Sequence, residues 1–89
     1  MDIIKKVKVT MFFKANIAAA AGADQTEFMI SPDVKQAIDD IRGYFSGRNI
    51  QGLLYTVFIN GATYDKALKE GYTIKEGDEI TIIPTILGG

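Results

Sequence analysis

The feature that most restricts the fold is a single long amphipathic pattern at residues 31–47, SPDVKQAIDDIRGYFSG. Its apolar residues recur at steps of three and four and form one stripe on a helix: Val34, Ala37, Ile38, Ile41 and Phe45. Ser31 is placed to accept a hydrogen bond from the first turn, Pro32 suits the first helical position, and Asp33 suits the positive helix end. Gly47 can close the other end. Such a helix must pack its apolar stripe on another element, and in this chain a sheet is the only candidate.

Short segments with alternating polarity supply that sheet. Residues 5–13 alternate, with Val7, Val9, Met11 and Phe13 on one side. The same argument predicts strands at residues 26–30, 53–60 and 79–83, and a weak strand or turn at 63–66. The alanine-rich stretch before residue 25 favours a short helical turn or a collapsed loop. Asn60-Gly61 is typical of a tight hairpin turn, and Pro84 cannot donate to a ladder, so the last strand is expected to end there.

The predicted order is strand, strand, helix, strand, short strand, strand, which indicates an α+β fold. A β-grasp (ubiquitin-like) arrangement fits it: a mixed sheet crossed by one main helix, with the final strand beside the first. A ferredoxin-like fold is less suitable because it needs a second long helix, and YDKALKEG is too short to provide one. We therefore expect a β-grasp domain at residues 1–84 and a flexible C-terminal tail at 85–89 that ends in diglycine.

Composition excludes several classes of function. Ten basic and eleven acidic residues give a net charge of -1, too balanced for a protein that binds nucleic acid by neutralising phosphates. No apolar run approaches about 20 residues, so we expect no membrane association and a cytoplasmic location. The chain contains no cysteine and no histidine, and therefore lacks thiolate nucleophiles, imidazole bases and most soft-metal ligands. We expect a protein that is not an enzyme and that binds no metal or cofactor itself.

The sequence resembles the β-grasp sulfur carriers: the small subunit of molybdopterin synthase, the thiamine-pathway sulfur carrier and the small archaeal modifier proteins. The resemblance covers nearly the whole chain. It depends on VKVTMFFKANIAAAAG, SPDVKQAIDDI, VFING, KEGDEITIIP and the terminal GG. Carriers of the molybdopterin branch usually have two prolines where this chain has Pro84 and Thr85, which leaves the branch open.

This resemblance implies a function for the C-terminus. The carboxylate of Gly89 would be adenylated by a ubiquitin-activating-type adenylyltransferase, which uses ATP and magnesium, and a sulfurtransferase would supply sulfur for a thiocarboxylate. The acceptor would be the molybdopterin synthase large subunit or another sulfur acceptor, with molybdenum or tungsten cofactor synthesis the leading pathway. Gly88 and Gly89 lack a Cβ and can thread a narrow channel. Ile86 and Leu87 would be apolar grips in that channel, and Pro84 would stiffen the exit from the sheet.

A docking surface is also expected. By alternation, Phe12, Phe58 and Ile83 fall on the sheet face opposite the helix, and in a β-grasp sheet their strands are neighbours. We interpret them as the surface that contacts the activating enzyme and the sulfur acceptor; the alternative is a set of isolated exposed hydrophobic residues. Four basic residues could bracket the tail and steer it to an acidic partner, but we interpret them as a solvated face: Arg48, Lys66, Lys69 and Lys75. The acidic residues Glu76, Asp78 and Glu79 could likewise pair with a basic partner surface. Asp78 is equally explained as a turn residue.

Two other functions stay open. The diglycine could join the chain to lysines of other proteins, as in a ubiquitin-like modifier. The chain could also be a binding module that uses only its sheet face and has an idle tail. Removal of Gly89 separates the binding module from the carrier, because a carrier loses all activity while a surface-binding module keeps its affinity.

Overall fold

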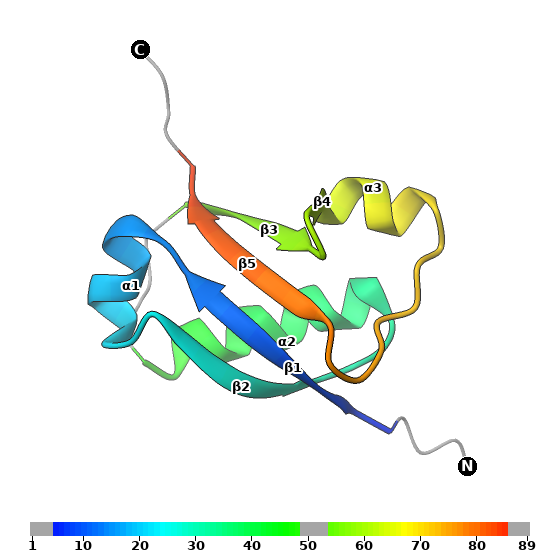
Figure 1. Ribbon diagram of the computed structural model, residues 1–89, viewed down its shortest axis with the longest axis horizontal. Coiled ribbons are helices and arrows are strands. Elements are labelled where there is room, and N and C mark those ends of the chain that lie inside the picture. Colours follow the sequence, from blue (N-terminus) through cyan, green and yellow to red (C-terminus); the bar gives the residue numbers. More distant parts are fainter. Residues whose placement is uncertain (1–4, 49–53, 86–89) are drawn as a thin grey trace.

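A five-stranded mixed sheet forms one layer of the computed structural model, which describes residues 5–48 and 54–85 (Figure 1). The strand order is β2-β1-β5-β3-β4. The bounds are β1 Val7–Phe13, β2 Gln25–Ile30, β3 Tyr55–Ile59, β4 Ala62–Thr63 and β5 Glu79–Pro84. β1 and β5 are parallel neighbours and the other pairs are antiparallel. The predicted mixed sheet, with the final strand beside the first, is confirmed.

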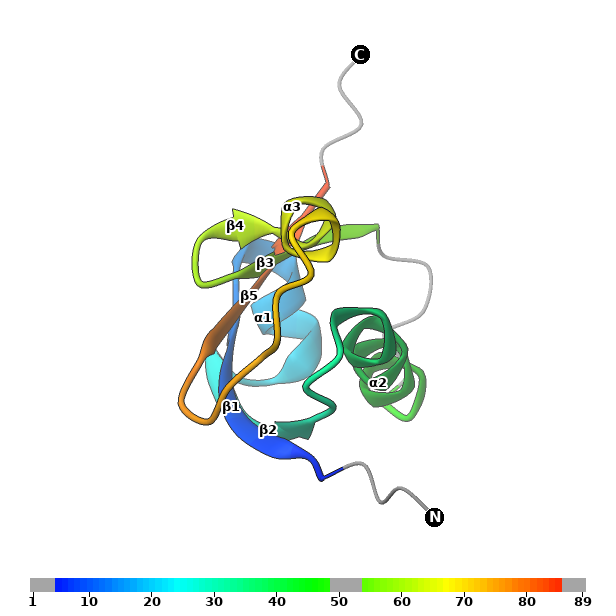
Figure 2. The same ribbon diagram turned by 90° about the vertical axis from the view of Figure 1, so that its right-hand side faces the viewer.

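Helix α2 (Val34–Ser46) packs on one face of this sheet, as Figure 2 shows from the side. Its predicted stripe is buried, and only Ile38 is partly exposed. The strands meet it with the alternate residues that the sequence indicated. The core consists of Val9, Met11, Phe13, Ile17, Ile30, Val34, Ala37, Ile41, Phe45, Val57, Ile59, Ala67, Ile74, Ile80 and Ile82. Burial of this apolar surface is the main term that stabilises the fold.

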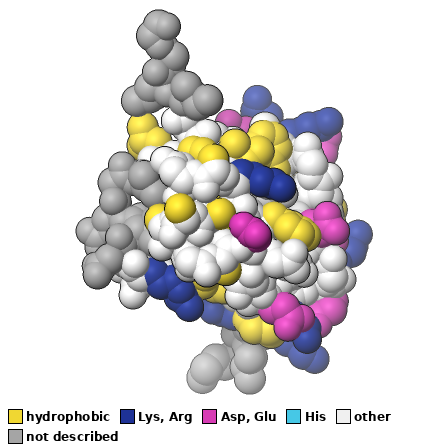
Figure 3. Space-filling model, turned by 60° about the vertical axis from the view of Figure 1, so that its left-hand side comes forward, with side chains coloured by type: hydrophobic (Ala, Val, Ile, Leu, Met, Phe, Trp, Pro, Cys, Tyr) yellow, Lys and Arg dark blue, Asp and Glu magenta, His cyan; other side chains and the backbone are white. Residues whose placement is uncertain are grey.

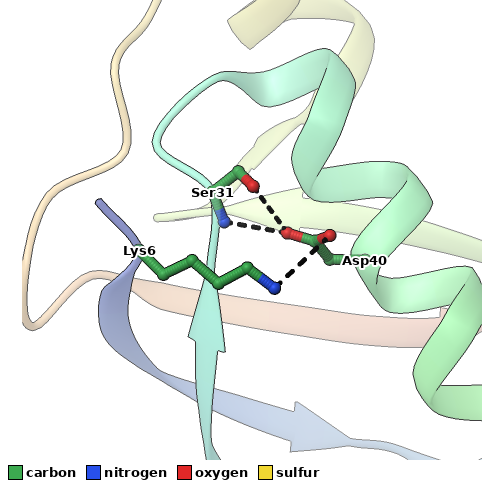
Figure 4. Close-up of polar contacts among 3 residues, drawn as sticks. All are labelled: Lys6, Ser31 and Asp40. Atoms are coloured by element: carbon green, nitrogen blue, oxygen red, sulfur yellow. Dashed lines mark hydrogen bonds and ion pairs between the residues drawn. The ribbon is translucent and has the colours of Figure 1, made fainter. Parts of the chain in front are cut away.

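The beginning of α2 differs from the prediction. Asp33 is the N-cap, and its Oδ2 accepts a hydrogen bond from the Gln36 N–H at 3.0 Å. The helix therefore begins at Val34, so Pro32 lies outside it and Ser31 is too far away to cap it. Ser31 instead donates twice to Asp40, from its N–H at 2.9 Å and from its hydroxyl at 2.8 Å (Figure 4).

Asp40 joins the helix to two strands. The Nζ of Lys6, just before β1, lies 3.9 Å from the second carboxylate oxygen of Asp40 (Figure 4). Ser31 is itself only 5% exposed, directly after β2. A polar group in such a site needs a partner, and the Asp40 carboxylate provides it. This contact fixes α2 against the end of β2.

Two short helices complete the chain. Helix α1 (Ala15–Ala21) ends at Gly22, which adopts a positive φ of 77°, in agreement with the predicted short helical turn. Helix α3 (Tyr64–Lys69) was not predicted: residues 63–66 were expected as a weak strand or turn. The Thr63 hydroxyl caps α3 by accepting from the Lys66 N–H at 3.3 Å, and Ala67 anchors it in the core at 4% exposure. None of the helices in the described ranges has the length and apolar character to cross a membrane.

Candidate functional site

Three apolar residues lie on the face of the sheet that α2 does not cover, and we call Phe12, Phe58 and Ile83 the open-face patch. Phe12 of β1 and Phe58 of β3 both pair with Thr81 of β5, one from each side. Ile83 pairs with Thr56 and is 37% exposed. The residues directly before and after Phe12 and Phe58 in the chain are buried in the core. Because successive residues of a strand point to opposite faces, Phe12 and Phe58 point away from the core.

The surroundings of the open-face patch are mixed. Phe12 and Phe58 are half-buried, and threonines at positions 10, 56 and 81 share their face. The space-filling view in Figure 3 shows exposed hydrophobic side chains interspersed with charged ones on the adjoining side of the molecule. The open face therefore mixes apolar and polar side chains, with Thr81 between the two aromatic residues, and surfaces that bind another protein reversibly are commonly mixed in this way.

The base of the C-terminal segment is held beside this patch. Pro84 pairs with Tyr55, so β5 stays in the sheet up to its last residue. The Thr85 N–H then donates to the Leu54 carbonyl at 2.9 Å, and the hydroxyls of Thr85 and Thr56 lie 3.0 Å apart. The chain is therefore fixed as far as Thr85. Of the predicted site residues, Ile86, Leu87, Gly88 and Gly89 lie outside the described residues.

Sequence reasoning did not find the residues that hold this exit, Leu54, Thr56 and Thr85. Alternation places Thr56 on the same face as Phe58, which was a usable signal. The contact itself joins residues 29 positions apart and depends on the β3–β5 register. A register between distant strands is set by tertiary packing, so it could not be predicted from either segment alone.

The charged residues considered near the tail do not form one cluster around this exit. Lys75 precedes β5, at the opposite end of that strand from Pro84, and its Nζ lies 5.4 Å from the centre of the Tyr72 ring. Arg48 stacks on Tyr44, with its guanidinium carbon 3.9 Å from the ring centre. These local contacts favour the interpretation as a solvated face.

Asp78 belongs to the turn before β5. Its Oδ2 accepts hydrogen bonds from the Lys75 N–H at 2.9 Å and the Tyr72 hydroxyl at 2.6 Å. Partial burial acts to raise the pKa of Asp78, but these hydrogen bonds outweigh it and lower that pKa below its usual value. The same bond to Asp78, with some desolvation, raises the pKa of the Tyr72 hydroxyl. Asp78 thus has a structural role, as the turn interpretation indicated.

Comparison with known proteins supports the fold. The small archaeal modifier protein 1 of Methanosarcina acetivorans matches at a TM-score of 0.67 and 21% identity, over 94% of this chain and 98% of that one. Its counterpart from Haloferax volcanii matches at 0.65 and 22%, over 92% and 99%. A Pyrococcus furiosus protein provisionally named molybdopterin converting factor, subunit 1, matches at 0.65 and 19%, over 90% and 99%.

No protein-family model and no curated protein matches the sequence. At these low identities the structural likeness shows the fold alone, and that fold is the ubiquitin-like β-grasp that the resemblance implied. Two of these neighbours are named small archaeal modifier protein 1 and the third a molybdopterin converting factor subunit, and each spans almost the same length as this chain. A function for this chain has to be argued from its own exit and open-face patch.

Proposed function

We propose that this chain is a sulfur carrier whose Gly89 carboxylate is adenylated, converted to a thiocarboxylate and used as a sulfur donor, with molybdenum or tungsten cofactor synthesis the leading pathway. In this proposal the chain is a non-catalytic carrier protein or subunit, and it is located in the cytoplasm. The observation that carries the proposal is the position of the strand exit: β5 leaves a β-grasp sheet at Pro84 directly beside the open-face patch, five residues before the end of a chain that finishes on diglycine.

The chemistry requires an activating partner. A carboxylate is a poor acyl donor because its leaving group would be oxide. An adenylyltransferase that uses ATP and magnesium would join AMP to the Gly89 carboxylate and release pyrophosphate. Sulfur from a sulfurtransferase would then displace AMP and leave a thiocarboxylate. Its sulfur is ionised at neutral pH and is therefore a good nucleophile, for the same reason that a thiolate attacks and a thiol does not.

Each part of the chain has a task in this proposal. Residues 1–84 form the domain that a partner holds, and residues 85–89 form the tail, which is held at Thr85 and enters the partner's active site beyond that residue. A fully extended tail of this length spans about 15–18 Å. Gly88 and Gly89 pass a narrow channel because they lack a Cβ, while Ile86 and Leu87 contact its walls. The open-face patch docks on the adenylyltransferase and afterwards on the synthase large subunit or another acceptor.

Two alternatives have their own support. The likeness in fold to the small archaeal modifier protein 1 favours a ubiquitin-like modifier, joined to lysines through the diglycine. The apolar open-face patch is also compatible with a binding module whose tail is idle. The first alternative shares the adenylation step with the carrier, and the second lacks it.

Intact mass spectrometry separates these functions. The full chain is incubated with ATP, magnesium, an adenylating enzyme and a sulfur source. A carrier gains about 16 Da, the exchange of one carboxylate oxygen for a nucleophilic sulfur. A chain without Gly89 serves as the control and should keep its mass. No mass change, with a partner set that converts a known carrier in parallel, would contradict the proposal, and a lysine-linked adduct would favour the modifier.

A further inference from the structure

One edge of the sheet presents a row of backbone groups that the fold does not use. The Phe13 N–H donates to the Asp24 carbonyl at 2.8 Å, which identifies this antiparallel pair as a hydrogen-bonded one. Hydrogen-bonded pairs alternate along such a ladder. The even-numbered residues of β2 therefore bond to β1, whereas Gln25, Glu27 and Met29 direct their N–H and C=O groups away from it.

These outward groups have almost no partners. Within residues 5–48 and 54–85, the Thr26 hydroxyl, 3.3 Å from the Glu27 carbonyl, is the one hydrogen-bonding contact that they have. Gln25, Glu27 and Met29 are all exposed, and Met29 is 49% exposed. The row has the spacing of a strand, with one outward residue at every second position, or about 6.5–7 Å. Only another extended backbone matches it along its length.

The two edges of the sheet differ in protection. The opposite edge, β4, has two residues and leads directly into α3. β2 has six residues, and its pairing with β1 runs without interruption from Ile30 to Gln25. Proteins usually block an edge strand with a proline, a bulge or charged side chains. β2 contains no proline and no bulge. Its one charged residue is Glu27, whose carboxylate is paired with Lys8 at a distance of 3.6 Å from Oε2 to Nζ.

The side chains on the two faces of β2 indicate which residues a strand that pairs with this edge should contain. On the helix side, Phe28 packs edge-on against Tyr44, with ring centres 5.3 Å apart, and the Arg48 guanidinium covers the same Tyr44. On the other side, Met29 offers an exposed apolar surface. A matching segment has apolar side chains at alternate positions and a carboxylate beside Arg48, whose positive charge is exposed.

The geometry points to β2 as a docking edge for an extended segment of another protein, apolar at alternate positions and acidic at the end near Arg48, which binds as an additional strand. A second copy of this chain fits less well. The two-fold register that uses all three outward residues is centred on Glu27 and sets its carboxylate against its own copy, and like charges directly opposite are destabilising. This edge adjoins the open-face patch, because Gln25 pairs with Phe12, but it would bind through backbone groups that the carrier proposal does not use, so the inference does not depend on the proposed function.

The test uses synthetic capped peptides of about nine residues, long enough to pair along β2. They alternate Val, Ile or Phe with Thr and carry Asp-Asp at either the amino or the carboxyl end. Scrambled peptides of the same composition are the controls. Titration is followed by the amide NMR signals of the full chain. We expect the amide chemical shifts of Gln25, Glu27 and Met29 to change and to saturate as peptide is added. This should happen with only one of the two peptides, either the one with Asp-Asp at its amino end or the one with Asp-Asp at its carboxyl end.

Backbone substitutions then separate strand addition from side-chain contact. Glu27→Pro removes one outward N–H without touching the β1 ladder, and binding should become about tenfold weaker, while Glu27→Gln retains it. If Glu27→Pro does not fold, N-methylation of the peptide gives the same information: methyl groups at one parity abolish binding and those at the other parity do not. A chain without Gly88 and Gly89 should bind unchanged, which keeps this result distinct from the carrier proposal.

Several results would overturn the inference. They are equal binding of scrambled peptides, shifts confined to other elements, loss of binding with either parity of methylation, or no binding by any peptide at millimolar concentration. A dimer of the free protein that Glu27→Pro dissociates would assign the edge to self-association instead.

Discussion

The hydroxyl oxygens of Thr56 and Thr85 lie 3.0 Å apart across the β3–β5 pair, at the point where the chain leaves the sheet. Together with the bond from the Thr85 N–H to the Leu54 carbonyl, this contact fixes the direction of the strand exit. In a carrier, the exit direction decides how the tail and the open-face patch meet a partner at the same time. A pre-ordered exit reduces the entropy lost on binding.

Replacement of Thr85 by valine should therefore affect the partner reaction more than the fold. The contact is exposed, so we expect the free energy of unfolding to change by less than about 1 kcal/mol. The KM for this chain in the adenylation reaction should rise a few-fold with little change in kcat, because the activated atoms are untouched. Thr10→Val, on the same sheet face, is the matched control. Equal kinetic effects of both variants would refute a role for the exit contact.

The open-face patch makes a second prediction. Phe58→Ser should weaken binding to the adenylyltransferase by about tenfold or more, because a half-buried aromatic residue in a binding surface is a typical hot spot. Leu68→Ser is the control, since Leu68 is 43% exposed on α3, outside the patch. Affinity is measured by calorimetry, with thermal unfolding to check the fold. If Leu68→Ser weakens binding as much as Phe58→Ser, the partner uses another surface.

The sequence was sufficient for the orientation of side chains in the strands and for the main helix. Around Phe12 and Phe58, buried and partly exposed residues alternate strictly. Such alternation predicts which side chains enter the core, because successive residues of a strand point to opposite faces. The stripe on α2 was predicted for the analogous reason. The cross-strand neighbours of Phe12 and Phe58 could not be predicted from the sequence. Thr81 lies between the two aromatic residues only because β5 pairs with both β1 and β3, which are distant from each other in the sequence.

The errors have a common physical cause. Two residues before α2 can both act as N-cap, and the choice of Asp33 over Ser31 depends on the Asp40 carboxylate, nine residues further along the chain from Ser31. Helix α3 is only six residues long and would be marginal in isolation. It forms because Ala67 is buried in the core. In both places a tertiary contact decides between local structures of similar energy, and a local pattern cannot show that decision.

The contact of Asp40 with Ser31 can be tested by its loss. Asp40→Ala removes the acceptor for both hydrogen bonds of Ser31, a residue that is 5% exposed, so its polar groups lose their partner inside the protein. We expect a loss of about 1–3 kcal/mol in the free energy of unfolding, measured by urea denaturation. Asp39→Ala is the matched control because Asp39 is exposed and lies on the same helix. A loss no larger than that of the control would mean that the contact does not stabilise the fold.

The turn before β5 should make stability depend on pH in the acid range. The pKa of Asp78 is lower in the folded protein than in the unfolded chain, where it is about 4. A carboxylate of this kind contributes stability that is fully present above the unfolded pKa and is lost as the pH falls through the folded one. Asp78→Asn should therefore lower the melting temperature at pH 7 and flatten its decline as the pH falls below about 4.

Tyr72→Phe provides the matched control for this linkage. It removes the 2.6 Å hydrogen bond to Asp78 but leaves the carboxylate and the bond from the Lys75 N–H in place. The acid decline in melting temperature should become shallower than in the unmodified chain, yet remain steeper than with Asp78→Asn. At alkaline pH the signs reverse: the raised pKa of Tyr72 means that its contribution is present below about pH 10 and is lost above it, so Tyr72→Phe should also flatten the alkaline decline. An unchanged acid decline in Asp78→Asn would show that other carboxylates govern acid unfolding.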